Sequence, residues 1–151
     1  MMGAVTYPNS KVVSYVSDNL VPWKVSFDTE GRLLRRYNVF WTPTIILADA
    51  KGNERYRITG FLPPETFVAC IALGRAYAAF WRHHYSRAAE LFDAVADEYP
   101  RLAVAPEAIY FRGVSRRKAT MDDVHLDEST EQLLVLYPES EWAQRAKPWA
   151  D

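Results

Sequence analysis

Residues 40–47 constrain the fold more than any other part of the sequence. Pro43 follows Trp41 and Thr42 and leads directly into the apolar, β-branched run 44–47. Proline has a fixed φ and no amide hydrogen, so it is tolerated at the start or edge of a strand and not in its middle. Residues 49–53 then supply polar turn formers. The sequence therefore predicts a short buried strand entered at Pro43, and it leaves the isomer of the preceding peptide bond open.

The segment after this strand predicts a hairpin and a long helix. Residues 55–59 alternate between polar and apolar side chains, which is typical of a returning antiparallel strand. Gly60 ends that strand, and Pro63, Pro64 and Glu65 are favourable residues for the first turn of a helix. The helical period predicts a buried stripe of Phe67, Cys70, Ile71, Gly74, Tyr77 and Trp81.

The segment before Pro43 predicts two helices separated by a strand. Asn9 or Ser10 can cap a first helix that ends near residue 19. Residues 21–27 alternate after a proline and predict a strand. Asp28 or Thr29 can cap a short second helix. The resulting order of helices and strands predicts a compact α/β unit in which helices cover a small mixed sheet.

Composition excludes several classes of partner. The chain has 151 residues, of which 49% are hydrophobic, and a formal net charge of -1. The net charge of the protein therefore produces no electrostatic field that would attract nucleic acid or an anionic membrane. No stretch approaches the roughly 18 apolar residues of a membrane span, and the first residues do not resemble a signal peptide, so we expect a cytoplasmic protein. The basic group of Arg112, Arg116, Arg117 and Lys118 is interpreted as a solvated helix face in preference to an anion site.

The residues around Pro43 resemble a known family. Residues 36–49, with Gly52, Arg57 and Gly60, are similar to the second half of a thioredoxin-like domain, and the resemblance extends over roughly residues 5 to 80. It implies that the residue matching Pro43 is in the cis form beside a redox-active CxxC. It also implies a binding site for extended peptides at Trp41, Thr42 and Pro43, where backbone groups at an exposed edge pair by strand addition. Packing of Trp41 without a binding role is the alternative.

The same resemblance shows what this sequence lacks. The family carries CxxC at the head of its first long helix, after an initial strand, and the matching helix here begins near Thr6. Cys70 is the only cysteine, so the chain can form neither a CxxC pair nor an internal disulfide. We expect a domain over 1–80 that lacks its first strand, through truncation or through loss of the motif in a natural lineage. The uncovered sheet edge would lower stability and favour self-association.

The remainder of the chain is expected to be helical. The order of Leu73, Gly74, Tyr77, Ala88, Phe92 and Pro100 resembles a tetratricopeptide unit, a helix pair of about 34 residues. A second, looser pair ends at Tyr137 and Pro138. The fold prediction is therefore α/β: an incomplete thioredoxin-like fold followed by an all-α, tetratricopeptide-like region over 66–151 that shares the 66–80 helix.

Two functions remain open at this stage. The resemblance favours a thiol-disulfide oxidoreductase whose catalytic cysteines are not in this chain, so the chain as given is expected to be inactive. The alternative is a noncatalytic module that binds a protein through the Pro43 groove and the helical repeats. Cys70 lies on an apolar stripe and is interpreted as a core residue. His83 and His84 are adjacent and have poor geometry for sharing a metal. His125, with Asp122, Asp123 and Asp127, is interpreted as part of a loop and helix cap, so no cofactor or metal is expected.

Overall fold

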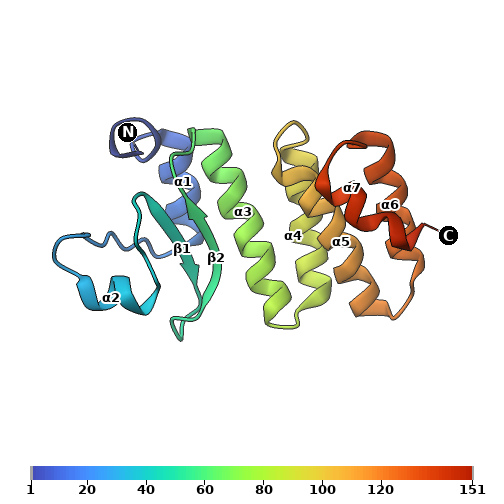
Figure 1. Ribbon diagram of the computed structural model, residues 1–151, viewed down its shortest axis with the longest axis horizontal. Coiled ribbons are helices and arrows are strands. Elements are labelled where there is room, and N and C mark those ends of the chain that lie inside the picture. Colours follow the sequence, from blue (N-terminus) through green and yellow to red (C-terminus); the bar gives the residue numbers. More distant parts are fainter. Residues whose placement is uncertain (1, 151) are drawn as a thin grey trace. The chain divides into compact units, whose positions relative to one another are not determined.

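A computed structural model describes residues 2–150, which fall into two compact units, Met1–Ile71 and Ala72–Asp151. Figure 1 labels the helices and strands along the chain. The first unit contains a π-helical turn and then α1, α2, β1 and β2, with the bounds Met2–Thr6, Ser10–Asn19, Gly31–Arg36, Thr44–Ala48 and Glu54–Thr59. Helix α3, Pro64–Trp81, contains the boundary between the units. The second unit continues with α4 to α7 and a final 3-10 turn, with the bounds Tyr85–Glu98, Val104–Thr120, Val124–Leu136, Glu141–Ala146 and Lys147–Trp149.

The two strands form the predicted antiparallel hairpin. Thr44 lies opposite Thr59 and Leu47 opposite Tyr56, and the register shifts between Leu47 and Ala48. Asp49 organises the turn: its Oδ1 accepts hydrogen bonds from the amides of Lys51 and Asn53, both at 2.9 Å. The backbone and side-chain hydrogen bonds from Asn53 lower the pKa of Asp49, and Arg55 adds to the effect. These contacts explain why so short a polar segment fixes the register.

One face of the hairpin belongs to the core of the first unit. Leu47 and Ile58 are buried there, as is Phe67 on α3. The amino-terminal turn is tied to the same region because the Thr6 hydroxyl donates to the Leu62 carbonyl at 2.6 Å. Asn9 caps α1, as the sequence predicts, by accepting a hydrogen bond from the Lys11 amide. The Thr6 contact thus joins the amino-terminal turn to the segment between β2 and α3.

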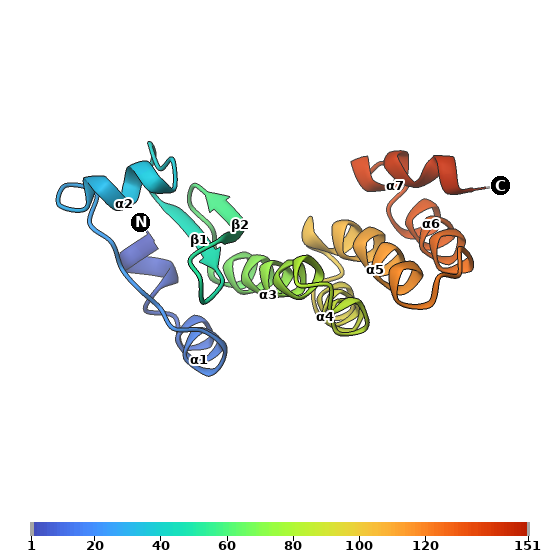
Figure 2. The same cartoon turned by 90° about the horizontal axis from the view of Figure 1, so that it is seen from below.

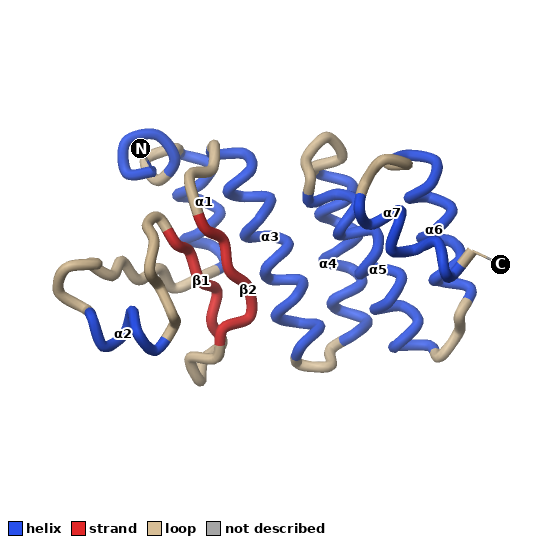
Figure 3. Tube along the Cα trace, viewed as in Figure 1, coloured by secondary structure: helices blue, strands red, loops and turns tan. Residues whose placement is uncertain are grey.

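The predicted strand over residues 21–27 is wrong. This segment is a loop between α1 and α2 (Figure 3). Val21 is 97% exposed and Trp23 is 75% exposed, whereas Val25 is half-buried. Alternation indicates that a segment can form a strand, but a strand also needs a partner to accept its backbone hydrogen bonds. The predicted cap at Asp28 or Thr29 is also wrong, because α2 begins after Glu30 without a side-chain cap.

The second unit is an all-helical layer in which α5 packs between α4 and α6 (Figures 1 and 2). Phe92 and Leu133 are completely buried, and the Phe92 ring lies 5.3 Å from Tyr77 and 5.8 Å from Phe111 between ring centroids. Helices α5 and α6 approach closely at Gly113, where an added Cβ would lie 2.5 Å from the Ser129 hydroxyl oxygen. Small and aromatic residues thus meet between these helices.

The stripe predicted along α3 is correct in part. Phe67, Ile71, Gly74 and Tyr77 are buried, but Cys70 is only half-buried. Trp81 is 54% exposed, because α3 ends at this residue and the preceding Phe80 takes the buried position. The α/β class with a helical extension is therefore confirmed, with these local corrections. Among the described residues, the helices are too short or too polar to cross a membrane.

Candidate functional site

The loop predicted to bind peptides connects α2 to β1. Trp41 is 64% exposed, Thr42 is exposed, and Pro43 is half-buried at the entrance to β1. The Thr42-Pro43 peptide bond is cis. The Pro43 carbonyl accepts a hydrogen bond from the Gly60 amide at 2.8 Å, and the Trp41 carbonyl accepts one from the Thr44 hydroxyl at 2.8 Å. Both ends of the loop are therefore anchored while the tryptophan ring faces solvent.

The loop continues into a sheet edge with open backbone groups. Along an antiparallel ladder, residue pairs that exchange backbone hydrogen bonds alternate with pairs that do not. Since Gly60 donates to Pro43, the next bonded pairs are Ile45 with Ile58 and Leu47 with Tyr56. Thr44 and Ile46 therefore direct their amides and carbonyls away from β2. Within the described residues β1 pairs with β2 alone, so this edge has no strand beside it.

Sequence reasoning found the loop but missed the length of the open edge. The Thr42 amide donates no backbone hydrogen bond within the described residues, and the edge continues through Thr44 and Ile46. Phe40 was also missed, although it is 84% exposed next to Trp41. The available signal was the polar alternation of 55–59, which assigns β2 to one side of β1 and leaves the other side open.

The side chain with thiol chemistry lies on α3. Cys70 is half-buried and faces neither a second cysteine nor a cysteine-based site, because the sequence contains no other cysteine. A thiol exchanges disulfides as a thiolate, and a second cysteine normally resolves the mixed disulfide. Cys70 by itself therefore cannot complete the redox cycle of a CxxC pair.

The histidines are dispersed and make local contacts. The Nδ1 atom of His83 lies 2.6 Å from the Tyr85 hydroxyl, and the Nδ1 atom of His125 lies 3.3 Å from a Glu128 carboxylate oxygen. His84 is exposed at the start of α4. Residues 2–150 contain no group of three or more potential metal ligands in suitable proximity.

The interpretation of the basic group as a solvated helix face is wrong for its first member. Arg112 is only 8% exposed, and its guanidinium donates to Asp93 at 2.8 Å and to Gln132 at 2.5 Å. Arg116 donates to the second Asp93 oxygen at 3.0 Å. Arg117 pairs with Asp123, and Lys118 lies over the Tyr85 ring. Sequence reasoning missed Asp93, which lies on another helix and bridges two of these cations.

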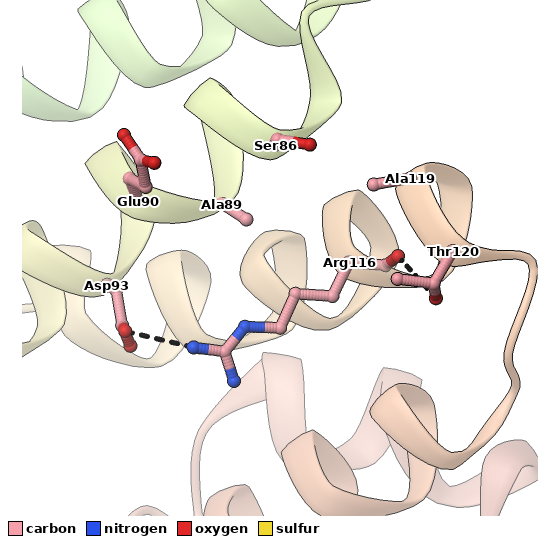
Figure 4. Close-up of a pocket in the computed structure, with 7 residues that line it drawn as sticks. All are labelled: Ser86, Ala89, Glu90, Asp93, Arg116, Ala119 and Thr120. Atoms are coloured by element: carbon pink, nitrogen blue, oxygen red, sulfur yellow. Dashed lines mark hydrogen bonds and ion pairs between the residues drawn. The ribbon is translucent and has the colours of Figure 1, made fainter.

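A shallow pocket of about 250 Å³ lies beside the Asp93 bridge (Figure 4). Helices α4 and α5 line it with Ser86, Ala89, Glu90, Asp93, Arg116, Ala119 and Thr120. The Arg116 side chain crosses toward Asp93 in this view, so the most basic group of the pocket is already engaged by a carboxylate. The charged groups Asp93 and Arg116 in the pocket wall thus form an ion pair that joins α4 and α5.

A second polar group lies between α3 and α5. The Tyr77 hydroxyl donates to Glu107 at 2.5 Å. Burial raises the pKa of Glu107, and the nearby Glu141 carboxylate adds to the rise, whereas the Tyr77 hydrogen bond and Arg145 oppose it. Tyr77 itself is buried among aromatic rings. This arrangement anchors α5 to α3 and provides no nucleophile or metal-ligand set.

Comparison with known proteins places one family on the first part of the chain. Residues 5–74 match the family model described as a thioredoxin-like domain. The match covers the Pro43 loop, both strands and the first half of α3. Comparison with curated proteins gave no match, and comparison with solved structures also gave none.

Proposed function

Since residues 5–74 belong to the thioredoxin-like domain family, we propose that this chain is a thioredoxin-like protein that binds an extended peptide without exchanging disulfides itself. The observation that carries the proposal is the juxtaposition of the exposed Trp41 ring with the open backbone edge formed by Thr42, Thr44 and Ile46. The bound peptide would be recognised by its backbone, and its side chains would be selected only weakly.

Binding by strand addition follows from the direction of the backbone groups. An extended peptide laid along β1 can exchange hydrogen bonds with Thr44 and Ile46 while the Trp41 ring covers its apolar side chains. Each such hydrogen bond contributes only about 0.5–1.5 kcal/mol because it replaces one with water. The β1 sequence TIILA has no charge, so an uncharged, β-branched or aromatic peptide would fit best.

We also propose that the helical unit is tetratricopeptide-like and provides a second protein-binding surface. Two Tyr-Pro pairs end α4 and α6, and they are linked because the Tyr137 hydroxyl donates to the Pro100 carbonyl at 2.6 Å. The close approach of α5 and α6 at Gly113 supports the same assignment. Helix pairs stacked in this way form extended binding surfaces in repeat proteins.

Replacing Trp41 with alanine is expected to weaken peptide binding about tenfold, because an aromatic ring that covers a peptide contributes about 1–2 kcal/mol. The probe is the alkylated, unfolded insulin B chain, which can bind but cannot exchange disulfides. Fluorescence anisotropy of the labelled chain measures the dissociation constant of each variant.

The matched control is Trp81→Ala, which removes an exposed tryptophan from the end of α3. This control should leave the dissociation constant within about twofold of the original value. Equal weakening by both substitutions would contradict a site at Trp41, as would the absence of binding by the original protein.

Thiol-disulfide oxidoreductase activity is the second candidate function, and the family match favours it. It would require a CxxC that residues 1–151 do not contain. We therefore expect this polypeptide to reduce insulin no faster than the thiol reagent alone, and Cys70→Ser to leave that rate unchanged. A faster rate that disappears in Cys70→Ser would reverse the assignment. The codons that precede Met1 in frame provide an independent test, because they either encode a strand followed by CxxC or do not.

A further inference from the structure

Residues 21–27 and the open edge of β1 are complementary to each other. The segment is neither helix nor strand, every residue in it except Val25 is exposed, and within residues 2–150 its backbone makes no hydrogen bond to β1. It carries a single charge, Lys24, and β1 carries none. We propose that a second copy of this chain supplies residues 21–27 as a strand that pairs with β1, and that the exchange is reciprocal.

The position of Pro22 sets which side of the segment can pair. In a strand, the amide and carbonyl of one residue point to one side and those of the next residue to the other. Pro22 has no amide hydrogen, and the Ser26 carbonyl already accepts a hydrogen bond from the Glu30 amide at 3.2 Å. Residues 22, 24 and 26 therefore belong on the outer side. The complete set of backbone groups at Val21, Trp23, Val25 and Phe27 faces the β1 edge.

The side chains agree with this orientation. Side chains alternate between the two faces of a strand, so Val21, Trp23, Val25 and Phe27 share one apolar face. Val21 and Trp23 are among the most exposed apolar residues of the described chain. The pairing is therefore parallel, because in parallel pairing the residues that bond to Thr44 and Ile46 lie on the opposite face from them. Val21, Trp23, Val25 and Phe27 then lie beside the apolar side of the sheet, where Leu47 and Ile58 are buried. The association would thus bury surface that the single copy leaves in water.

The same geometry closes the assembly at two copies. Each chain offers one open β1 edge and one unpaired segment, so a reciprocal exchange uses both and gives a two-fold dimer. The added strand presents Pro22 and Lys24 along its outer edge, and proline and lysine are residues that prevent further strand addition. A dimer would also cover the edge proposed above for peptides, although the inference does not depend on peptide binding.

The first test is sedimentation equilibrium of the full chain from about 1 µM to about 1 mM, a range that covers the affinities of weak dimers. We expect a monomer-dimer equilibrium. Val25→Pro removes an amide on the pairing side and should weaken the dimer by about tenfold or more. The matched variant Lys24→Pro removes an amide on the outer side and should leave the dimer intact. A monomer throughout the range, or equal effects of the two prolines, would overturn the proposal.

The second test is amide hydrogen exchange at low and high protein concentration. The amides of Thr44 and Ile46 should become protected as the concentration rises, whereas those of Ile45 and Leu47, which already face β2, should not change. Protection of Thr44 and Ile46 that is independent of concentration would mean that the segment pairs within one chain, and it would also overturn the proposal. Retained binding of the insulin B chain by a strictly monomeric protein would reject the dimer while leaving the proposed function in place.

Discussion

Replacing Asp93 with alanine is expected to lower the free energy of unfolding of the helical unit by about 2–4 kcal/mol, because it leaves a buried cation without its carboxylate. Asp93 accepts hydrogen bonds from Arg112 at 2.8 Å and from Arg116 at 3.0 Å. The Nε atom of Arg112 is buried and has no hydrogen-bond partner within the described structure. Loss of Asp93 would leave Gln132 as the acceptor for this guanidinium. Urea unfolding followed by circular dichroism measures the change.

The control for this prediction is Asp97→Ala, one turn further along α4, where the carboxylate is exposed. Its effect should remain within about 0.5 kcal/mol, as for most surface substitutions. Adding Arg112→Met to the Asp93→Ala variant removes the stranded charge and should recover a large part of the lost stability. If Asp93→Ala and Asp97→Ala unfold at the same urea concentration, the bridge does not stabilise the unit.

The hairpin could be predicted from the sequence because local residues determine it. Pro43 fixes where β1 begins, and the Asp49 turn fixes where it ends and how β2 returns. The start of α1 at Asn9 was predicted for the same reason, since its side chain accepts a hydrogen bond from an amide two residues away. Signals confined to neighbouring residues do not depend on the rest of the fold.

The failures concern residues whose state depends on distant partners. Residues 21–27 have the pattern of a strand, but the described structure offers them no adjacent strand. Arg112 has the charge of a surface residue, yet it is buried because Asp93 and Gln132 lie 19 and 20 positions away in sequence. Periodicity along one segment cannot identify such partners.

The candidate site was predictable to the same extent. Trp41, Thr42 and Pro43 were identified because proline marks the entrance to the strand. The extension of the edge through Thr44 and Ile46 requires the strand register, which becomes known only when Gly60 is placed against Pro43. A slip of one residue in the strand register would exchange the β1 residues that bond to β2 with those that face the open side. The sequence therefore locates a site made of backbone groups, but it does not determine which residues the open edge includes.

Replacing Phe92 with alanine is expected to destabilise the helical unit by about 3–5 kcal/mol, because it removes a fully buried ring and leaves a cavity that the neighbours only partly fill. Phe92 has no exposed surface and contacts rings from two other helices. The Tyr77 ring meets it edge-on at 5.3 Å, and the Phe111 ring stacks at 5.8 Å. Both geometries add to the energy of area burial. Urea unfolding again gives the free energy.

The same substitution at Phe40 is the control, because that ring is exposed and its loss should change the free energy of unfolding by less than about 0.5 kcal/mol. Phe92→Leu distinguishes lost volume from lost ring contacts: it retains an apolar side chain, so it should cost less than Phe92→Ala. Amide exchange should show the largest loss of protection in α4 and α5, the helices that carry Phe92 and Phe111. If Phe92→Ala instead unfolds at the same urea concentration as Phe40→Ala, the aromatic cluster cannot be the core that holds these helices together.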